Sequence, residues 1–321
     1  MVGASPSRAK HLASLLAGLL ACALVLAEAT AALAAFPGGN GRIVFRSSRS
    51  GSPYLYAVNA KGKNLVRVTT GSDTSPATSP DGRSIAFVRA IGGSAAKQRV
   101  FVANADGTDV RRLTGIAQTE LDPAWSPDGT SIVYVSRTAP DAPFTLFVVD
   151  VSSGAREQLT DPVTGVADRA PAWSPQGDRI AFASNRGGGL PEIWLVDVGS
   201  GALTRLTENA EADANPSWSP DGRKLAVDRC CALKSSEIYV IKVADGSERN
   251  VTKSRRQDTD PAWSPDGRRI AYVSSGTDGN LDVWIVTLDG SLPLFRLTSN
   301  VGPDVSPDWA VGAGGATGGT A

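Results

Sequence analysis

The sequence predicts an all-β fold, a six-bladed β-propeller built from four-stranded antiparallel blades. Two observations carry this prediction. A short phrase recurs at near-constant spacing, and the part of a unit that is missing at the start of the chain reappears at its end. A fixed period of 45–48 residues indicates a repeat architecture, in which one unit cannot bury its apolar faces alone.

The recurring phrase is Trp-Ser-Pro-Asp-Gly or a close variant. Its six copies are 47, 48, 45, 45 and 46 residues apart and begin at, or in the last case contain, Thr78, Trp125, Trp173, Trp218, Trp263 and Trp309. Proline presets φ, aspartate bonds back to the backbone and glycine accepts positive φ, so each copy predicts a tight turn. Because the tryptophans recur at one slot, we expect them to fill the core between blades rather than to stack on sugars.

The unit around Trp263 shows the order of strands within a blade. Its four strands are predicted at 260–264, 269–274, 282–287 and 294–298. The two middle strands are apolar at successive positions, whereas a strand with one face in water would alternate. Both faces of each sheet must therefore be covered, as they are between neighbouring blades.

The two ends of the chain predict a closed ring. Residues 41–69 supply a second, third and fourth strand without a first, and residues 306–311 supply a lone first strand. If these segments complete one blade, the exposed sheet edge disappears and the ring has six blades. The propeller is therefore expected over residues 36–311, followed by a disordered Gly/Ala/Thr tail at 312–321.

The first 35 residues have the composition of an export signal. Arg8 and Lys10 precede an apolar run from Leu12 to Leu26, and small residues follow. The pattern predicts a secretory signal peptide over 1–35 and a mature protein that is periplasmic or extracellular and does not span the membrane. An uncleaved membrane anchor is the alternative.

Charge and histidine content narrow the possible functions. The 32 basic and 32 acidic residues balance without a basic arm, which argues against nucleic acid as a partner. His11 is the only histidine and lies in the predicted signal, so the mature chain cannot build a Ser-His-Asp triad or a His-ligated zinc site. We therefore predict a non-catalytic protein without a cofactor, and a monomer.

Each unit carries one acid three residues before the proline that stands two residues ahead of the tryptophan slot. These candidate binding residues, predicted to ring one mouth of the central channel, are Asp73, Glu120, Asp168, Asp213, Asp258 and Asp304. Carboxylates around a common axis could bind a protein, a peptide or calcium. The alternative is that each acid caps its own loop and recurs because the repeat was duplicated. Asp122 and Asp260, directly before their prolines, would add acid locally.

Two adjacent cysteines, Cys230 and Cys231, follow the second strand of the fifth unit. In an exported protein they could form a vicinal disulfide. Adjacent Cα atoms lie only about 3.8 Å apart, however, which is shorter than the usual span of a disulfide. Two thiols, or a disulfide to another chain, are the alternatives.

The stretch 261–272, followed by an apolar strand and a final Arg-Leu-Thr, resembles the repeat of the TolB-like β-propeller family. The resemblance covers residues 36–311. It implies an exported scaffold that binds an envelope or secreted protein or peptide. The N-terminal α/β domain of TolB is not expected, because the repeats begin directly after the signal. The same repeat also resembles the propellers of some prolyl-oligopeptidase-type enzymes.

The function predicted from these observations is an exported, non-catalytic scaffold for a protein or peptide partner. Two alternatives stay open. One is a carbohydrate-active enzyme that uses two carboxylates roughly 5–10 Å apart. The other is a protein that binds calcium or a small ligand at the channel mouth.

Overall fold

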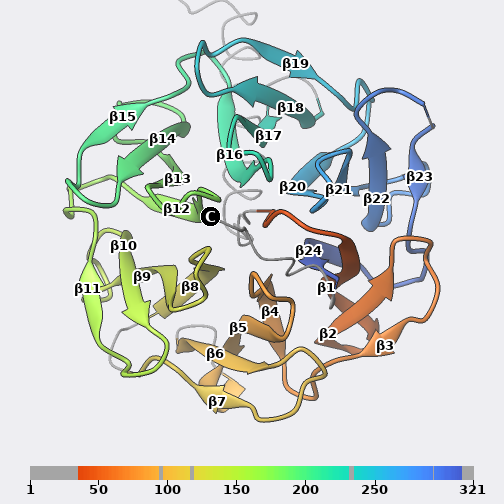
Figure 1. The fold of residues 1–321 in the computed structure, drawn as a ribbon, viewed down its shortest axis with the longest axis horizontal. Helices are drawn as coiled ribbons and strands as arrows, with labels where there is room; N and C mark the ends of the chain where they lie inside the picture. Colours follow the sequence, from red (N-terminus) through yellow and green to blue (C-terminus); the bar gives the residue numbers. More distant parts are fainter. Residues whose placement is uncertain (1–34, 94–96, 116–118, 231–234, 292, 313–321) are drawn as a thin grey trace, which may run out of the picture.

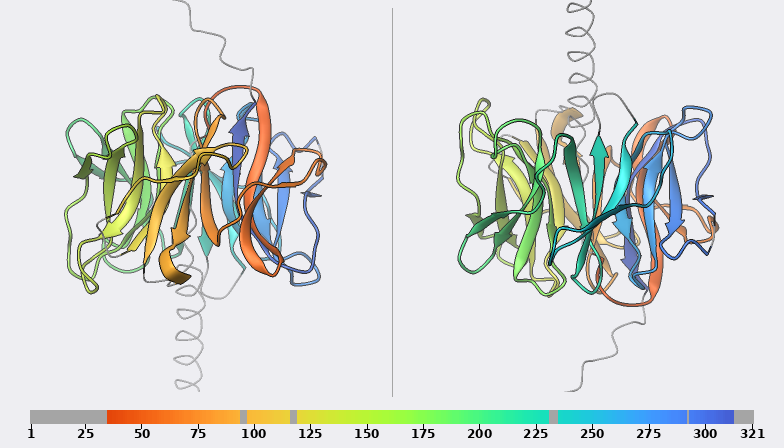
Figure 2. Two further views of the ribbon diagram at one scale, coloured as in Figure 1. Left: turned by 90° about the horizontal axis from the view of Figure 1, so that it is seen from below. Right: turned by 90° about the horizontal axis from the view of Figure 1, so that it is seen from above.

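The computed structural model describes residues 35–93, 97–115, 119–230, 235–291 and 293–312. Within these ranges, six four-stranded sheets stand as blades around a common axis (Figure 1), and side views show them as one thick disc (Figure 2). The predicted six-bladed propeller is confirmed. All of the predicted signal (1–35) except Ala35, and all of the predicted tail (312–321) except Gly312, lie outside the described residues. No helix in the described part is long and apolar enough to span a membrane.

The strands of each blade run in order from the axis to the rim. Blade 1 consists of β24 (Asp304–Val311), β1 (Asn40–Ser50), β2 (Ser52–Asn59) and β3 (Val66–Arg67). Blade 2 consists of β4 (Asp73–Thr78), β5 (Ser84–Ala90), β6 (Gln98–Asn104) and β7 (Arg111–Arg112). Blade 3 consists of β8 (Thr119–Trp125), β9 (Ser131–Arg137), β10 (Thr145–Asp150) and β11 (Arg156–Gln158).

The second half of the ring has the same order. Blade 4 consists of β12 (Asp168–Trp173), β13 (Arg179–Ser184), β14 (Glu192–Asp197) and β15 (Leu203–Arg205). Blade 5 consists of β16 (Ala212–Trp218), β17 (Lys224–Cys230), β18 (Glu237–Lys242) and β19 (Glu248–Asn250). Blade 6 consists of β20 (Asp258–Trp263), β21 (Arg269–Ser274), β22 (Asp282–Thr287) and β23 (Phe295–Arg296). One short 3₁₀ turn (Ile91–Gly93) follows β5.

The ring is closed by the two ends of the described chain. β24 pairs antiparallel with β1, and Ile43 stands opposite Trp309. In blade 2 the motif tryptophan is replaced by Thr78, whose backbone N–H donates to Oδ2 of Asp308 in blade 1 at 2.5 Å. A buried carboxylate therefore holds the seam at the slot where blade 2 lacks a tryptophan.

The five motif tryptophans are buried, with 0–5% of each residue exposed. Nε1 of Trp125 donates to the carbonyl oxygen of Ala77 at 3.1 Å, and Nε1 of Trp218 donates to that of Ala172 at 3.0 Å. Each of these two bonds reaches the innermost strand of the preceding blade. The tryptophans therefore pack between blades, as expected from their single slot.

The two axial ends of the disc differ. At one, the turn end, the Ser-Pro-Asp-Gly turns follow the innermost strands. Residues 35–40 cross the centre here (Figure 1). They are held by two backbone hydrogen bonds, from the N–H of Ala35 to the carbonyl oxygen of Trp218 and from the N–H of Gly38 to that of Pro265. At the other, the acid end, the innermost strands begin and the loops between second and third strands lie.

Candidate functional site

The fold brings the six predicted acids together at the acid end, at the first or second residue of each innermost strand. All six residues are 0% exposed. Burial raises the pKa values of Glu120, Asp213 and Asp258. A partner could therefore reach these carboxylates only if the loops around them opened.

Asp168 shows how the acids are held. Its carboxylate accepts hydrogen bonds from Thr160, which follows the last strand of blade 3, and from Ser184 in its own blade, both at 2.7 Å. Arg186 completes the set at 2.5 Å. These contacts agree with the alternative in which each acid satisfies groups of its own loop and blade. That the six acids bind a ligand stays a prediction.

The partners of the acids repeat after three blades. In blades 2 and 5 an arginine stands directly opposite the acid, and the ion pairs Arg89–Asp73 and Arg229–Asp213 both measure 2.6 Å. In blades 1 and 4 a serine stands opposite, and an arginine two residues later makes the ion pair. In blades 3 and 6 a serine stands opposite Glu120 and Asp258, and neither acid has an ion pair among the described residues.

A bulge two residues after each acid places one residue of every innermost strand at positive φ. The φ values lie between 48° and 55° at Ser75, Asp122, Ala170, Asn215, Asp260 and Ser306. Non-glycine residues rarely adopt this conformation, and the ladder shifts register at the same place in all six blades. The strain is thus part of the repeat.

Asp122 and Asp260 occupy this bulge in blades 3 and 6. Oδ2 of Asp122 accepts from the backbone N–H of Ala170 in the next blade at 3.3 Å, while its Oδ1 is buried without a partner. Burial raises the pKa of Asp122 to about 7, although the nearby charge of Arg169 opposes the shift.

The carboxylates of Asp228 and Asp260 meet at the side-chain amide of Asn215. The side-chain amide of Asn215 donates to Oδ2 of Asp228 at 2.8 Å and to Oδ1 of Asp260 at 3.1 Å. Burial raises the pKa of Asp228 to about 6. Sequence reasoning missed Asp228, although a carboxylate among apolar residues of a second strand was a signal.

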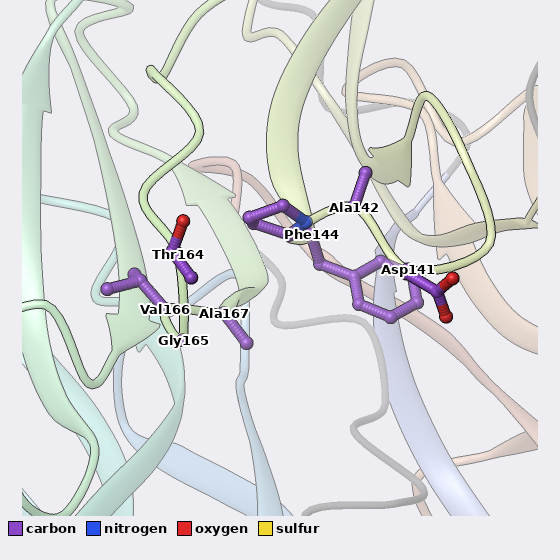
Figure 3. A pocket seen from close by; sticks show the side chains of 8 residues that line it. Asp141, Ala142, Phe144, Thr164, Gly165, Val166 and Ala167 are labelled. Carbon is purple, nitrogen blue, oxygen red and sulfur yellow. The ribbon is translucent and has the colours of Figure 1, made fainter.

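A pocket opens at the acid end between blades 3 and 4 (Figure 3). It encloses about 270 Å³ between the loop 141–144 and the loop 164–167. Phe144 and Ala167 form a parallel backbone bridge, so the two walls are joined. The ring of Phe144, which lines this pocket, also contacts two arginines: the guanidinium carbons of Arg169 and Arg137 lie 3.6 and 5.0 Å from its centre.

The remaining predicted sites are only partly described. Cys230 ends β17, is half-buried and stands opposite Ala212, whereas Cys231 lies outside the described residues. The vicinal disulfide therefore stays a prediction. In the described ranges, no group of three or more His, Cys, Asp or Glu side chains is placed to hold a metal ion.

Comparison with known proteins supports the fold. Solved structures similar to this chain include TolB from Acinetobacter baumannii, with 22% identity, a TM-score of 0.72, and coverage of 84% of this chain and 67% of that one. A putative TolB from Agrobacterium tumefaciens has 20% identity and a TM-score of 0.64, with 82% and 90% covered. Kuenenia stuttgartiensis hydrazine synthase has 12% identity and a TM-score of 0.69, with 85% and 47% covered.

At these identities the structural likeness concerns the fold alone. Among curated proteins, none matches the sequence. The family model of the TolB beta propeller domain matches residues 27–168 and 84–229, which together span more than half of the chain. The repeats, the closed ring and this match agree, and the chain belongs to the TolB beta propeller domain family.

Proposed function

We propose that this chain is an exported, non-catalytic scaffold that binds a protein or peptide at the acid end of its propeller. The observation that carries this proposal is the apolar surface there. Val301 is 100% exposed, Val163 is 46% exposed and Ile91 is 36% exposed, each on a different loop of the acid end. Val163 borders the pocket between blades 3 and 4, and exposed apolar side chains beside a pocket are typical of an interaction surface. Val301 lies half a turn away, between blades 6 and 1.

Two further observations support a binding role without catalysis. The described chain contains no histidine, and the acids at the acid end are buried in contacts that stabilise the blades. At the turn end, residues 35–40 already occupy the centre of the ring (Figure 1). We therefore place the partner at the acid end.

A pull-down with surface variants tests the binding proposal. The partner is sought in envelope extract with the wild-type protein, with Val163→Asp/Val301→Asp, and with the control Val110→Asp at the rim, where the valine is 40% exposed. We expect one reproducible partner that the wild type and the rim variant retain and the acid-end variant loses. Recovery of no reproducible partner, or equal loss with the rim variant, would count against the proposal.

Export rests on the sequence of residues 1–35 alone. Fractionation of cells that express the full chain, with N-terminal sequencing of the product, tests it. We expect a mature protein outside the cytoplasm that begins near Phe36. Full-length protein in the cytoplasm would contradict export without affecting the binding proposal.

A carbohydrate-active enzyme is the second candidate, and the pair Asp228–Asp260 is what favours it. Two acids in different surroundings could divide acid and base roles. The Asn215 amide that bonds to both, however, occupies the space between them that a glycosidic oxygen would need. Turnover of a glycan by the wild type that Asp228→Asn abolishes would establish the enzyme. Calcium binding likewise stays a proposal, which titration calorimetry with calcium would test.

A further inference from the structure

Arg169 is a partly buried arginine whose side chain makes no hydrogen bond with any residue that the structure describes. Its Nη1 is buried without a partner, and within the described ranges its guanidinium only stacks on Phe144, 3.6 Å from the ring centre. By contrast, Arg186 and Arg229 bond to buried carboxylates. A guanidinium carries five N–H donors, so its lack of acceptors is costly unless something else supplies them.

A second cation shares the same ring. The guanidinium carbon of Arg137 lies 5.0 Å from the centre of the Phe144 ring, and its Nε is also buried without a partner. Arg137 does donate from Nη1 to the carbonyl oxygen of Pro140. Both positive charges are attracted to the aromatic ring but repel each other. Burial lowers the pKa of Arg169, the charges of Asp122 and Asp168 oppose this shift, and the repulsion from Arg137 adds to it.

The nearest acid does not neutralise this pair. No oxygen of Asp122 lies within 4.0 Å of either guanidinium, and Oδ1 of Asp122 is itself without a partner. Because burial raises its pKa to about 7, Asp122 carries only part of a negative charge at neutral pH. Asp168 is already paired with Arg186. Among the described residues, neither guanidinium is therefore ion-paired with a carboxylate, although Asp141 lines the pocket.

The fold does not require these charges. Half a turn around the ring, between blades 6 and 1, the corresponding backbone contact is the same: Asp304 N–H bonds to Leu281 as Asp168 N–H bonds to Phe144. There the three side chains are Leu281, Ser275 and Val305 in place of the phenylalanine and two arginines. The scaffold closes equally well without an aromatic ring or a cation at this place.

The pocket shares Phe144 with the two arginines, because this residue both lines the pocket and contacts both guanidiniums. Its lining includes Pro143, Phe144, Val166 and Ala167. Asp141 and Thr164 also line it, from opposite sides (Figure 3). A volume of about 270 Å³ accommodates an apolar side chain. Because the Phe144–Ala167 bridge joins the walls, the pocket is formed before any ligand arrives.

We propose that Arg137 and Arg169 bind a carboxylate of a peptide whose adjoining apolar side chain fills the pocket between Pro143 and Val166. Arginine is suited to this role because its planar fork matches a carboxylate and it tolerates partial burial. The carboxylate comes either from the end of a chain or from an Asp or Glu side chain. This inference rests on the proposed function, since it specifies what the acid end recognises.

Peptide titrations followed by NMR of the isotope-labelled protein test the proposal. The probes are acetyl-Gly-Ser-Gly-Leu with a free carboxylate, the same peptide as an amide, and an amidated acetyl-Gly-Leu-Glu-Gly. Each is titrated against the wild type, Arg169→Met and the matched control Arg67→Met. Arg67 also stacks on an aromatic ring, Tyr54 at 5.0 Å, but lies on the rim.

We expect at least one carboxylate peptide to shift resonances of the loops 141–144 and 164–167, and the fully neutral amide to bind at least tenfold more weakly. Arg169→Met should weaken binding of the carboxylate peptide by a similar factor, and Arg67→Met should leave it unchanged. The preferred acid peptide shows whether the carboxylate is terminal or internal. If Arg169→Met fails to fold, Arg137→Gln serves in its place.

Equal affinity for acid and amide, or an unchanged affinity in the arginine variants, would overturn the inference. Absence of binding by every probe would overturn it as well. In either case a partner that is recovered in the pull-down and lost in the acid-end variant would leave the proposed function standing. Carboxylate-dependent peptide binding without a recoverable partner would support this inference and count against the proposed function.

Discussion

The two halves of the ring share a buried framework and differ at the acid-end surface. Blades 3 and 6 both oppose their acid with a serine, both place an aspartate at the bulge, and both bury a tyrosine at the same point of the second strand, Tyr134 and Tyr272. At the acid end between blades 3 and 4 the chain carries Arg137, Phe144 and Arg169. At the corresponding place between blades 6 and 1 it carries uncharged aliphatic or small residues. What recurs after three blades is the scaffold, as expected from duplication of a three-blade unit, and what differs is where a specific function can reside.

The largest effect should come from breaking the arginine–acid pair of blade 5 and comparing it with its counterpart in blade 2. Asp213→Ala leaves Arg229, whose side chain is 5% exposed, with the 41% exposed Glu248 as its remaining carboxylate, and we expect a loss of about 2–3 kcal/mol in the free energy of unfolding. Asp73→Ala should cost less, because Arg89 is 23% exposed and can turn to water. Urea denaturation of both variants measures the difference. Equal losses would show that burial of the arginine does not set the cost.

A smaller effect concerns the pH dependence of stability. The folded protein raises the pKa of Asp122 to about 7, so between about pH 4 and pH 7 it binds a proton that the unfolded chain has released. Stability should therefore fall as the pH rises through this window, by on the order of 2 kcal/mol between pH 5 and pH 7.5. Asp122→Asn should flatten this dependence, as judged by thermal unfolding at several pH values. Asp308 and Asp228, with pKa values of about 6, contribute in the same direction. An unchanged slope in Asp122→Asn would contradict the assignment.

The smallest effect is expected in the turn of blade 4. Gln176 replaces the motif aspartate, and the serine hydroxyl of this turn donates instead to Asp178 at 2.7 Å. In blade 3 the same hydroxyl donates to Asp128 at 2.6 Å. Gln176→Asp should change stability by about 0.5 kcal/mol or less, because the bond already has an acceptor. An increase of more than about 1 kcal/mol in the free energy of unfolding, measured by heat or urea, would show that Asp178 does not replace the motif aspartate as acceptor.

The repeat made the fold predictable. Turn chemistry and doubly buried strands depend on residues that are close in the sequence, and the period shows that the same unit recurs. Comparison of the two ends of the chain then reveals the split blade and with it the closure of the ring. The direction of the six carboxylates was not predictable, since it depends on serine, threonine and arginine partners in other strands and blades. Asp168, for example, is held by Thr160, Ser184 and Arg186.

The features that matter most for the candidate site were also beyond sequence reasoning. Arg169 stands out only when it is seen against Phe144 and without a hydrogen bond, since a lone arginine after an acid carries no signal. Asn215, Asp228 and Asp260 come from three strands of two blades, and only the ring brings them together.

Hydrogen–deuterium exchange with and without the captured partner tests most directly that the acid end between blades 3 and 4 is the recognition site. We predict that the partner protects peptides covering 137–146 and 161–169, and that the corresponding segments of the other half, 275–283 and 299–305, are protected less. The Ser-Pro-Asp-Gly turns should be unchanged. Protection centred on the turn end, or equal protection in the two halves of the acid end, would contradict this account.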